Sequence, residues 1–215
     1  MKLNKYLEMP GIGKRIENTN VKGNFMEYQQ EVRNYINKEI EVLKSLDVEA
    51  INEVINVLEK ARKRNADIYV FGNGGSAATA SHYCCDFNKG ISSAIKGNKY
   101  RFHCLSDNIS TLTAVANDIA YEEIFREQLR GVLREHDLVI GISGSGNSEN
   151  VIRAVEYAKE IGIEVIGITG YQGGRLKKLA DYHLDTKIDD MQVSEDIHMM
   201  FDHLMVTCIR RHSEA

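Results

Sequence analysis

Residues 68–76 of the chain read IYVFGNGGS, and this stretch decides the fold class. Four apolar residues predict a short buried strand, and three glycines within residues 72–75 predict a tight turn. A helical pattern over residues 76–88 follows directly. A buried strand, a turn and a helix make up the repeating unit of a parallel sheet that is covered by helices.

The same alternation continues on both sides of this stretch. Further strands are predicted at 101–105, 138–142, 164–168 and, more weakly, 182–186, and further helices near 109–117, 121–135, 147–161 and 193–211. Before it, apolar spacing predicts a helix over 26–46, and Asp47 is the expected N-cap of a helix over 48–64. The sequence therefore predicts an α/β fold, with a parallel sheet covered on both faces.

The composition is that of a single globular domain. The chain has 215 residues, of which 43% are apolar and 27% charged. Residues 1–24 contain the only proline and show no apolar period, so they are predicted to be an irregular arm before a domain over 25–215. The apolar stripe of the helix over 26–46 would be exposed on a monomer, which predicts a homo-oligomer.

Charge and cysteine content exclude several classes of protein. A net charge of -4 gives no basic field for a nucleic acid. The polar N-terminus does not look like a signal peptide, and no run approaches the roughly 18 apolar residues of a membrane span. None of the four cysteines belongs to a C-x-x-C pair, so reduced thiols and a cytoplasmic location are expected.

The loop after the third predicted strand is rich in hydroxyl groups. Residues 143–148 read SGSGNS and open a helix. Hydroxyls and backbone N–H groups at such a place can hold a phosphate without lysine or arginine. The loop is neither a Walker P-loop nor a G-x-G-x-x-G motif. A capped turn would need fewer serines and glycines, so we predict a phosphate site. For the glycine loop over 72–75, ligand binding and a tight turn are equally good interpretations.

Histidines and carboxylates that could bind a metal occur on two predicted helices. His82 and Asp86 are four residues apart and share a helix face. The C-terminal helix offers Glu195, Asp196, His198, Asp202 and His203. Such sets suit a divalent metal, although any one member could simply be a solvated residue. The spacing favours His198 with Asp202, whereas roughly 12 Å of helix separates Glu195 from His203, and it leaves the ligand set open.

Together with residues 113–118, which read TAVAND, these motifs resemble the phosphoheptose isomerases, which have the SIS (sugar isomerase) fold. The resemblance runs from about Met26 to the C-terminus. It implies a three-layer αβα sandwich with a five-stranded parallel sheet, usually a tetramer with active sites near subunit interfaces. The implied activity is aldose–ketose isomerisation of a phosphorylated sugar, with sedoheptulose 7-phosphate as the expected substrate.

The resemblance also implies roles for individual residues. Substrate contacts are expected from Asn73, Gly74, Gly75, Ser76, Asn117, Asp118 and Glu195, and phosphate contacts from Ser143, Gly144, Ser145 and Ser148. A divalent metal, with zinc as the first expectation, would be bound by His82, Asp86, Glu195 and His203. This set leaves His198 and Asp202 outside. Asp86 would be the base that moves a proton through an ene-diolate, and His203 the group that exchanges a proton at oxygen.

Three residues depart from the family's usual pattern. Asp86 stands where the family usually has glutamate, Glu195 where it has glutamine, and Gly144 where it has threonine. Two carboxylates with two neutral imidazoles would balance the charge of a dication, although coordination would lower the basicity of Asp86. The rival interpretation is a non-catalytic SIS module that binds a sugar phosphate or a protein. The presence of both His82 and His203 favours the enzyme.

Overall fold

This computed structural model describes residues 26–213. The chain divides into two units, Met1–Lys38 and Glu39–Ala215, and the division falls inside helix α1 (Gln29–Lys44). The second unit carries every strand. The predicted arm over 1–24 lies outside the described residues and stays a prediction. The predicted domain, 25–215, begins earlier in the chain than the second unit does.

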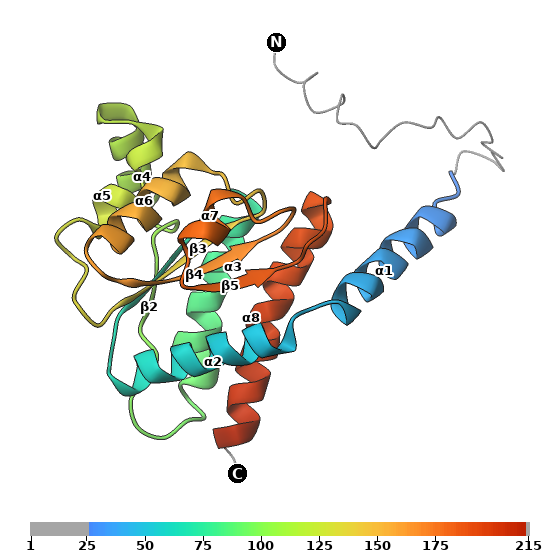
Figure 1. The fold of residues 1–215 in the computed structure, drawn as a ribbon, viewed down its shortest axis with the longest axis horizontal. Coiled ribbons are helices and arrows are strands. Elements are labelled where there is room, and N and C mark those ends of the chain that lie inside the picture. The colour runs from blue at the N-terminus through green and yellow to red at the C-terminus, as the bar shows by residue number, and fades with distance from the viewer. Residues whose placement is uncertain (1–25, 214–215) are drawn as a thin grey trace. The chain divides into compact units, whose positions relative to one another are not determined.

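Five parallel strands form one sheet in the order β2-β1-β3-β4-β5 (Figure 1). They are β1 (Ile68–Phe71), β2 (Phe102–Cys104), β3 (Leu138–Ser143), β4 (Glu164–Thr169) and β5 (Tyr182–Asp185). In the register, Val70 of β1 pairs with Cys104 of β2 and with Ile140 of β3. The predicted parallel sheet is confirmed, including its weak fifth strand.

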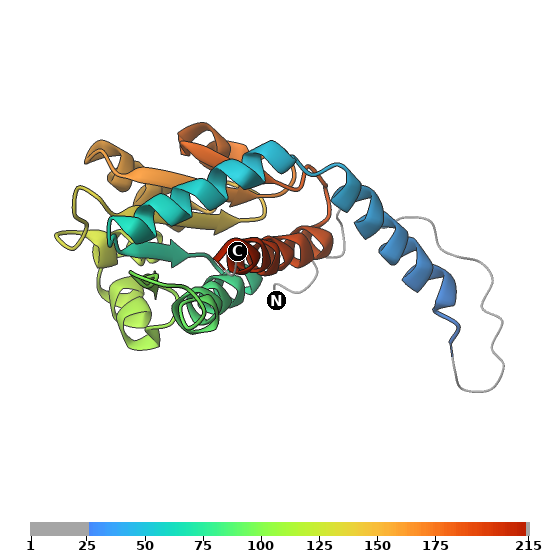
Figure 2. The same ribbon diagram turned by 90° about the horizontal axis from the view of Figure 1, so that it is seen from below.

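Helices cover both faces of the sheet, and each face has its own apolar cluster. Alternate strand residues such as Val70 and Ile140 face α2 (Val48–Lys63), α3 (Gly75–Cys85) and α8 (Met191–Ser213). Their neighbours, such as Phe71 and Val139, face α4 (Ile109–Asp118), α5 (Arg126–Leu129), α6 (Glu149–Glu160) and α7 (Gly174–Leu179). Figure 2 shows the long α8 along one side of the sheet. This is the three-layer αβα sandwich that was predicted.

The sequence pattern also places most helix ends correctly. Asp47 is the N-cap of α2, and its carboxylate accepts a hydrogen bond of 2.9 Å from the backbone N–H of Ala50.

Among residues 26–213, no helix is both long and apolar enough to cross a membrane. The four cysteines are free thiols, as expected.

The predicted helix over 121–135 is wrong. Only a 3-10 turn (Tyr121–Glu123) and the short α5 form there. Arg130 adopts an extended backbone and Gly131 a φ of +71°, and together they stop the helix. The pattern also missed α7, whose N-cap Gly173 and first residue Gly174 are both glycines with positive φ.

Candidate active site

The glycine loop (residues 72–75) and the serine loop (residues 143–148) lie next to each other, because β1 and β3 are neighbouring parallel strands. Phe71, the last residue of β1, pairs with Gly141 near the end of β3. Both loops therefore leave the sheet at the carboxyl ends of its strands. This is the edge where parallel sheets bind ligands.

Gly72 and Gly74 have steric reasons to be glycine, and Gly75 lies against the carboxylate of Glu195. Gly74 has a φ of +55°, which disfavours a side chain. A Cβ atom on Gly72 would lie 2.8 Å from the carbonyl oxygen of Ile142, and one on Gly75 would lie 2.2 Å from Oε2 of Glu195. The loop is thus a tight turn, and it also brings the carboxylate of Glu195 against the start of α3.

Asn73 is held by three hydrogen bonds from two residues. Its amide exchanges two hydrogen bonds of 2.9 Å with the amide of Asn150, which is buried at the start of α6. The hydroxyl of Tyr121 donates a third bond, of 3.0 Å, to Oδ1 of Asn73. Sequence reasoning predicted neither partner. These bonds fix the orientation of Asn73 before any ligand arrives.

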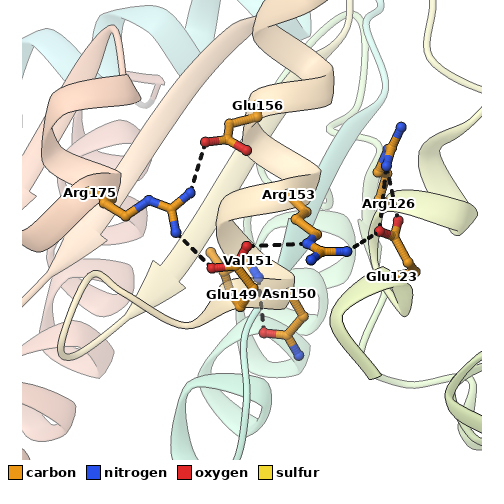
Figure 3. Close-up of polar contacts among 8 residues, drawn as sticks. All are labelled: Glu123, Arg126, Glu149, Asn150, Val151, Arg153, Glu156 and Arg175. Carbon is orange, nitrogen blue, oxygen red and sulfur yellow. Dashed lines mark hydrogen bonds and ion pairs between the residues drawn. The ribbon is translucent and has the colours of Figure 1, made fainter. Parts of the chain in front are cut away.

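Ion pairs brace α6 against its neighbours on the same face (Figure 3). Glu149 pairs with Arg175 of α7 at 2.7 Å and with Arg153 at 3.2 Å, and Arg153 also reaches Glu123 at 2.6 Å. The hydrogen bonds from Arg175 and then Arg153 lower the pKa of Glu149. Exposed pairs contribute little one by one. As a network they hold the first turn of α6, which follows the serine loop.

The hydroxyls of the serine loop converge. Ser143 is buried, and its Oγ lies 3.1 Å from Oγ of Ser148. Ser148 is the N-cap residue of α6, yet its side chain makes no capping hydrogen bond. The exposed Ser145 accepts a bond of 3.2 Å from the backbone N–H of Asn147. The simple capped turn therefore does not account for Ser148, whose hydroxyl contacts Ser143 instead of the backbone of α6.

The backbone of the serine loop packs against the next loop. A Cβ atom on Gly146, whose φ is +66°, would lie 2.0 Å from the carbonyl oxygen of Gly173. The backbone N–H of Gly170 donates to the carbonyl of Gly144 at 2.8 Å. These contacts leave no room for a side chain at Gly146. The loop is therefore rigid without any ligand.

A second group of polar side chains lies between α3 and α8. Nε2 of His82 and Nε2 of His203 are 3.0 Å apart. From Nε2 of His82, the carboxylate of Asp86 lies at 3.6 Å and that of Asp202 at 3.8 Å. One ligand atom of each of these four residues lies within 4.8 Å of the others. Three of the four predicted metal ligands are thus together, and Asp202 joins them.

The backbone changes its winding at this group. Helix α3 ends at Cys85, and a π-helical segment runs over Asp86–Ile91. Such segments are rare and are often found at functional sites. Gly90 lies beside Asp86, since a Cβ atom there would be 3.7 Å from Oδ1 of Asp86. The wider turn therefore begins at the predicted catalytic carboxylate.

Two further polar residues of α8, His198 and Asp202, are fully buried. Burial lowers the pKa of His198 to about 4, and the backbone of Thr169 opposes the change only in part. Burial and the nearby charge of Asp86 raise the pKa of Asp202 to about 8. His198 is thus a neutral residue of the core, and it does not belong to the group around His82.

Comparison with known proteins identifies the family. A family model described as SIS domain matches residues 27–170. The phosphoheptose isomerase of Helicobacter pylori (strain P12) is 36% identical over 177 residues, which are 82% of this chain and 89% of that protein. The enzyme of the same name from Clostridium acetobutylicum is 33% identical over 196 residues, 87% and 94% of the two chains. This chain belongs to the phosphoheptose isomerase family.

A solved structure agrees with this membership. The phosphoheptose isomerase of Neisseria gonorrhoeae superposes with a TM-score of 0.78 at 28% identity, over 85% of this chain and 98% of the other. The fold and the enzyme class expected from the sequence, an isomerase, are therefore confirmed. The expected roles of single residues remain predictions, and the structure says where each of those residues lies.

Within the phosphoheptose isomerase fold, the predicted substrate residues fall into two groups. Asn73, Gly74, Gly75, Ser76, Glu195 and the serine loop surround the carboxyl ends of β1 and β3. Asn117 and Asp118 end α4 and are joined by a hydrogen bond of 2.8 Å. Tyr121, just beyond them, reaches Asn73, so this end of α4 is close to the glycine loop.

Two of the departures from the family pattern have visible surroundings. A Cβ atom on Gly144 would lie 2.9 Å from the sulfur of Met191, so Met191 occupies the space that the family's usual threonine would need. Glu195 lies against Gly75 rather than in the group around His82. The predicted ligand set is therefore not gathered at one point in this chain.

Proposed function

We propose that this chain interconverts sedoheptulose 7-phosphate and a heptose 7-phosphate by metal-assisted proton transfer. One observation carries the proposal: His82 and His203, 3.0 Å apart, stand beside Asp86 in a chain whose relatives are named phosphoheptose isomerases. An aldose–ketose isomerase needs a base near C1 and C2 of the sugar and a proton donor at the carbonyl oxygen. It also needs a site that binds the phosphate group, away from the reacting carbons. The described residues can supply each of them.

The acid–base chemistry falls to Asp86 and His203. Asp86 takes the proton from one carbon and returns it to the neighbouring carbon, while His203 exchanges a proton with the oxygens. A bound divalent ion would polarise the carbonyl group, and the nitrogen and oxygen atoms at His82, Asp86 and His203 suit zinc. Without an ion, Nε2 of His82 and Nε2 of His203 lie at hydrogen-bond distance from each other.

The serine loop binds the phosphate in this proposal. Ser143, Ser145 and Ser148 offer hydroxyl donors beside the first turn of α6, whose dipole attracts an anion. The hydrogen bonds around Asn73 hold it ready for the sugar hydroxyls. Binding energy from the phosphate would thus orient the reacting carbons.

The decisive experiment is an assay of the purified full chain with sedoheptulose 7-phosphate. Appearance of the aldose, followed by NMR, with exchange of solvent deuterium into C1 or C2, is the expected result. Glucose 6-phosphate and unphosphorylated sedoheptulose serve as controls. Tight binding of the heptose phosphate with no turnover would contradict the enzyme and support the binding module.

We further propose that the enzyme is a homotetramer. Apolar residues of α1 are exposed along its length: Val32, Ile36, Ile40 and Leu43. An exposed apolar stripe of this kind is typical of a contact surface. Light scattering at micromolar concentration should therefore give a mass close to four chains of 24.3 kDa. The double substitution Val32→Lys, Ile36→Lys should lower that mass. A wild-type monomer would refute the proposal.

A further inference from the structure

Asp202 is the least expected member of the group around His82. Its side chain is fully buried, and neither carboxylate oxygen has a hydrogen-bond partner among residues 26–213. Leaving a buried polar group unpaired destabilises the folded chain, and a charged one does so more strongly. Buried carboxylates are therefore nearly always paired or bound to a metal. This one needs a partner that the protein alone does not supply.

The surroundings of Asp202 are suited to a cation as that partner. Nε2 of His82 lies 3.8 Å from Oδ2 of Asp202, 3.6 Å from Asp86 and 3.0 Å from Nε2 of His203. Atoms bound at about 2.0–2.2 Å around a tetrahedral ion lie roughly 3.3–3.6 Å apart. The observed separations bracket this range, so small movements of side chains would bring all four atoms to one ion.

Glu195 is not a member of this group. Its carboxylate lies against Gly75, at the first residue of α3. His82 lies on the same helix, seven residues further, which corresponds to roughly 10 Å. On α8, the rise from Glu195 to His203 is of similar size. Along the axes of both helices, the backbone at Gly75 and Glu195 is thus about 10 Å or more from the backbone at His82 and His203.

We propose that Asp202, and not Glu195, is the fourth protein ligand of a divalent metal in this chain, together with His82, Asp86 and His203. The inference rests on the metal site of the proposed function and changes its ligand set. Two carboxylates and two neutral imidazoles then balance the charge of the ion. Glu195 is left at the glycine loop, where it faces the substrate.

Zinc binding by the metal-free full chain tests the inference, with calorimetry or a chromophoric chelator as the readout. Asp202→Asn should weaken the affinity for zinc by at least about 100-fold, because loss of an outer-shell partner alone costs 10–100-fold. Glu195→Gln, the matched control, should keep wild-type affinity. The inference would be overturned if Asp202→Asn kept wild-type affinity for zinc, whether or not Glu195→Gln lost it. Equal losses of affinity in the two variants would also overturn it.

A second measurement does not depend on the folding of a variant. Crystals of the wild-type chain soaked in zinc should show an anomalous peak within about 2.2 Å of the Asp202 carboxylate. A peak beside Glu195, or no peak at this group, would refute the ligand set. Asp202→Asn replaces a buried carboxyl group with a neutral side chain of the same size, so its melting temperature without metal should stay close to that of the wild type.

Failure of the ligand assignment can be distinguished from failure of the proposed isomerase function. Zinc bound through Asp202 without turnover of any heptose phosphate would remove the function and leave the ligand assignment standing. Turnover by a chain that binds no zinc at this group would keep the isomerase and overturn the ligand assignment.

Discussion

Replacing His203 with alanine should abolish isomerisation and most zinc binding. Nε2 of His203 lies 3.0 Å from Nε2 of His82 and within 4.8 Å of both carboxylates of the group. The change removes a proposed metal ligand and the proposed acid at the same time. General acid–base groups contribute about 10²–10⁴-fold to rate, so kcat should fall by at least that factor. Stopped assays for the aldose and zinc titration measure the two losses.

His198→Ala is the matched control on the same helix. His198 is fully buried and lies outside the group around His82. Its removal leaves a cavity, so we expect a lower melting temperature with zinc affinity retained and kcat reduced far less. If His198→Ala lost the metal and His203→Ala kept it, the assignment of both roles on α8 would be wrong. If neither change affected bound zinc, the binding module would become the better interpretation.

The sheet and the position of the site could be read from local sequence, because each strand is short, apolar and followed by a distinctive loop. Residues 68–76 alone contain a strand, a turn and the start of a helix, and the structure places each of them as predicted. The serine loop was also predictable, since its hydroxyls follow a strand. Both predictions depend on residues that are adjacent in the chain.

The composition of the group around His82 was not predictable in the same way. Spacing along α8 paired His198 with Asp202, and both do face inward. Which of them meets α3 depends on how the two helices lie side by side, and no local pattern contains that information. Resemblance chose Glu195, whose carboxylate lies beside Gly75 and outside the group around His82.

The hydrogen-bond partners of Asn73 could not be predicted from local sequence either. Asn150 follows the serine loop, and Tyr121 lies in a segment that was predicted to be helical. An asparagine at the start of a helix usually indicates a cap. Its actual partner comes from another loop of the sheet, a long distance away in the chain. Only the strand order, with β1 beside β3, brings the two asparagines together.

The double substitution Ser145→Ala, Ser148→Ala should raise KM for the phosphorylated substrate by about 100-fold or more. A hydrogen bond to a charged group is worth about 1.5–3 kcal/mol, and two would be lost. The phosphate is far from the reacting carbons and is held in both ground and transition states, so kcat should change much less. Initial rates over a range of sedoheptulose 7-phosphate give both constants.

The stability of the double variant should stay close to that of the wild type. The variant loses only the contact of Ser148 with Ser143 and the bond from the backbone N–H of Asn147 to the exposed Ser145. The loop backbone is fixed by its own contacts, including the close approach of Gly146 to Gly173. Ser45→Ala, at an exposed serine before α2, is the control and should leave KM unchanged. Inhibition by inorganic phosphate should weaken in parallel with KM in the double variant. An unchanged KM, with phosphate inhibition intact, would place the phosphate elsewhere and leave the serine loop with a structural role only.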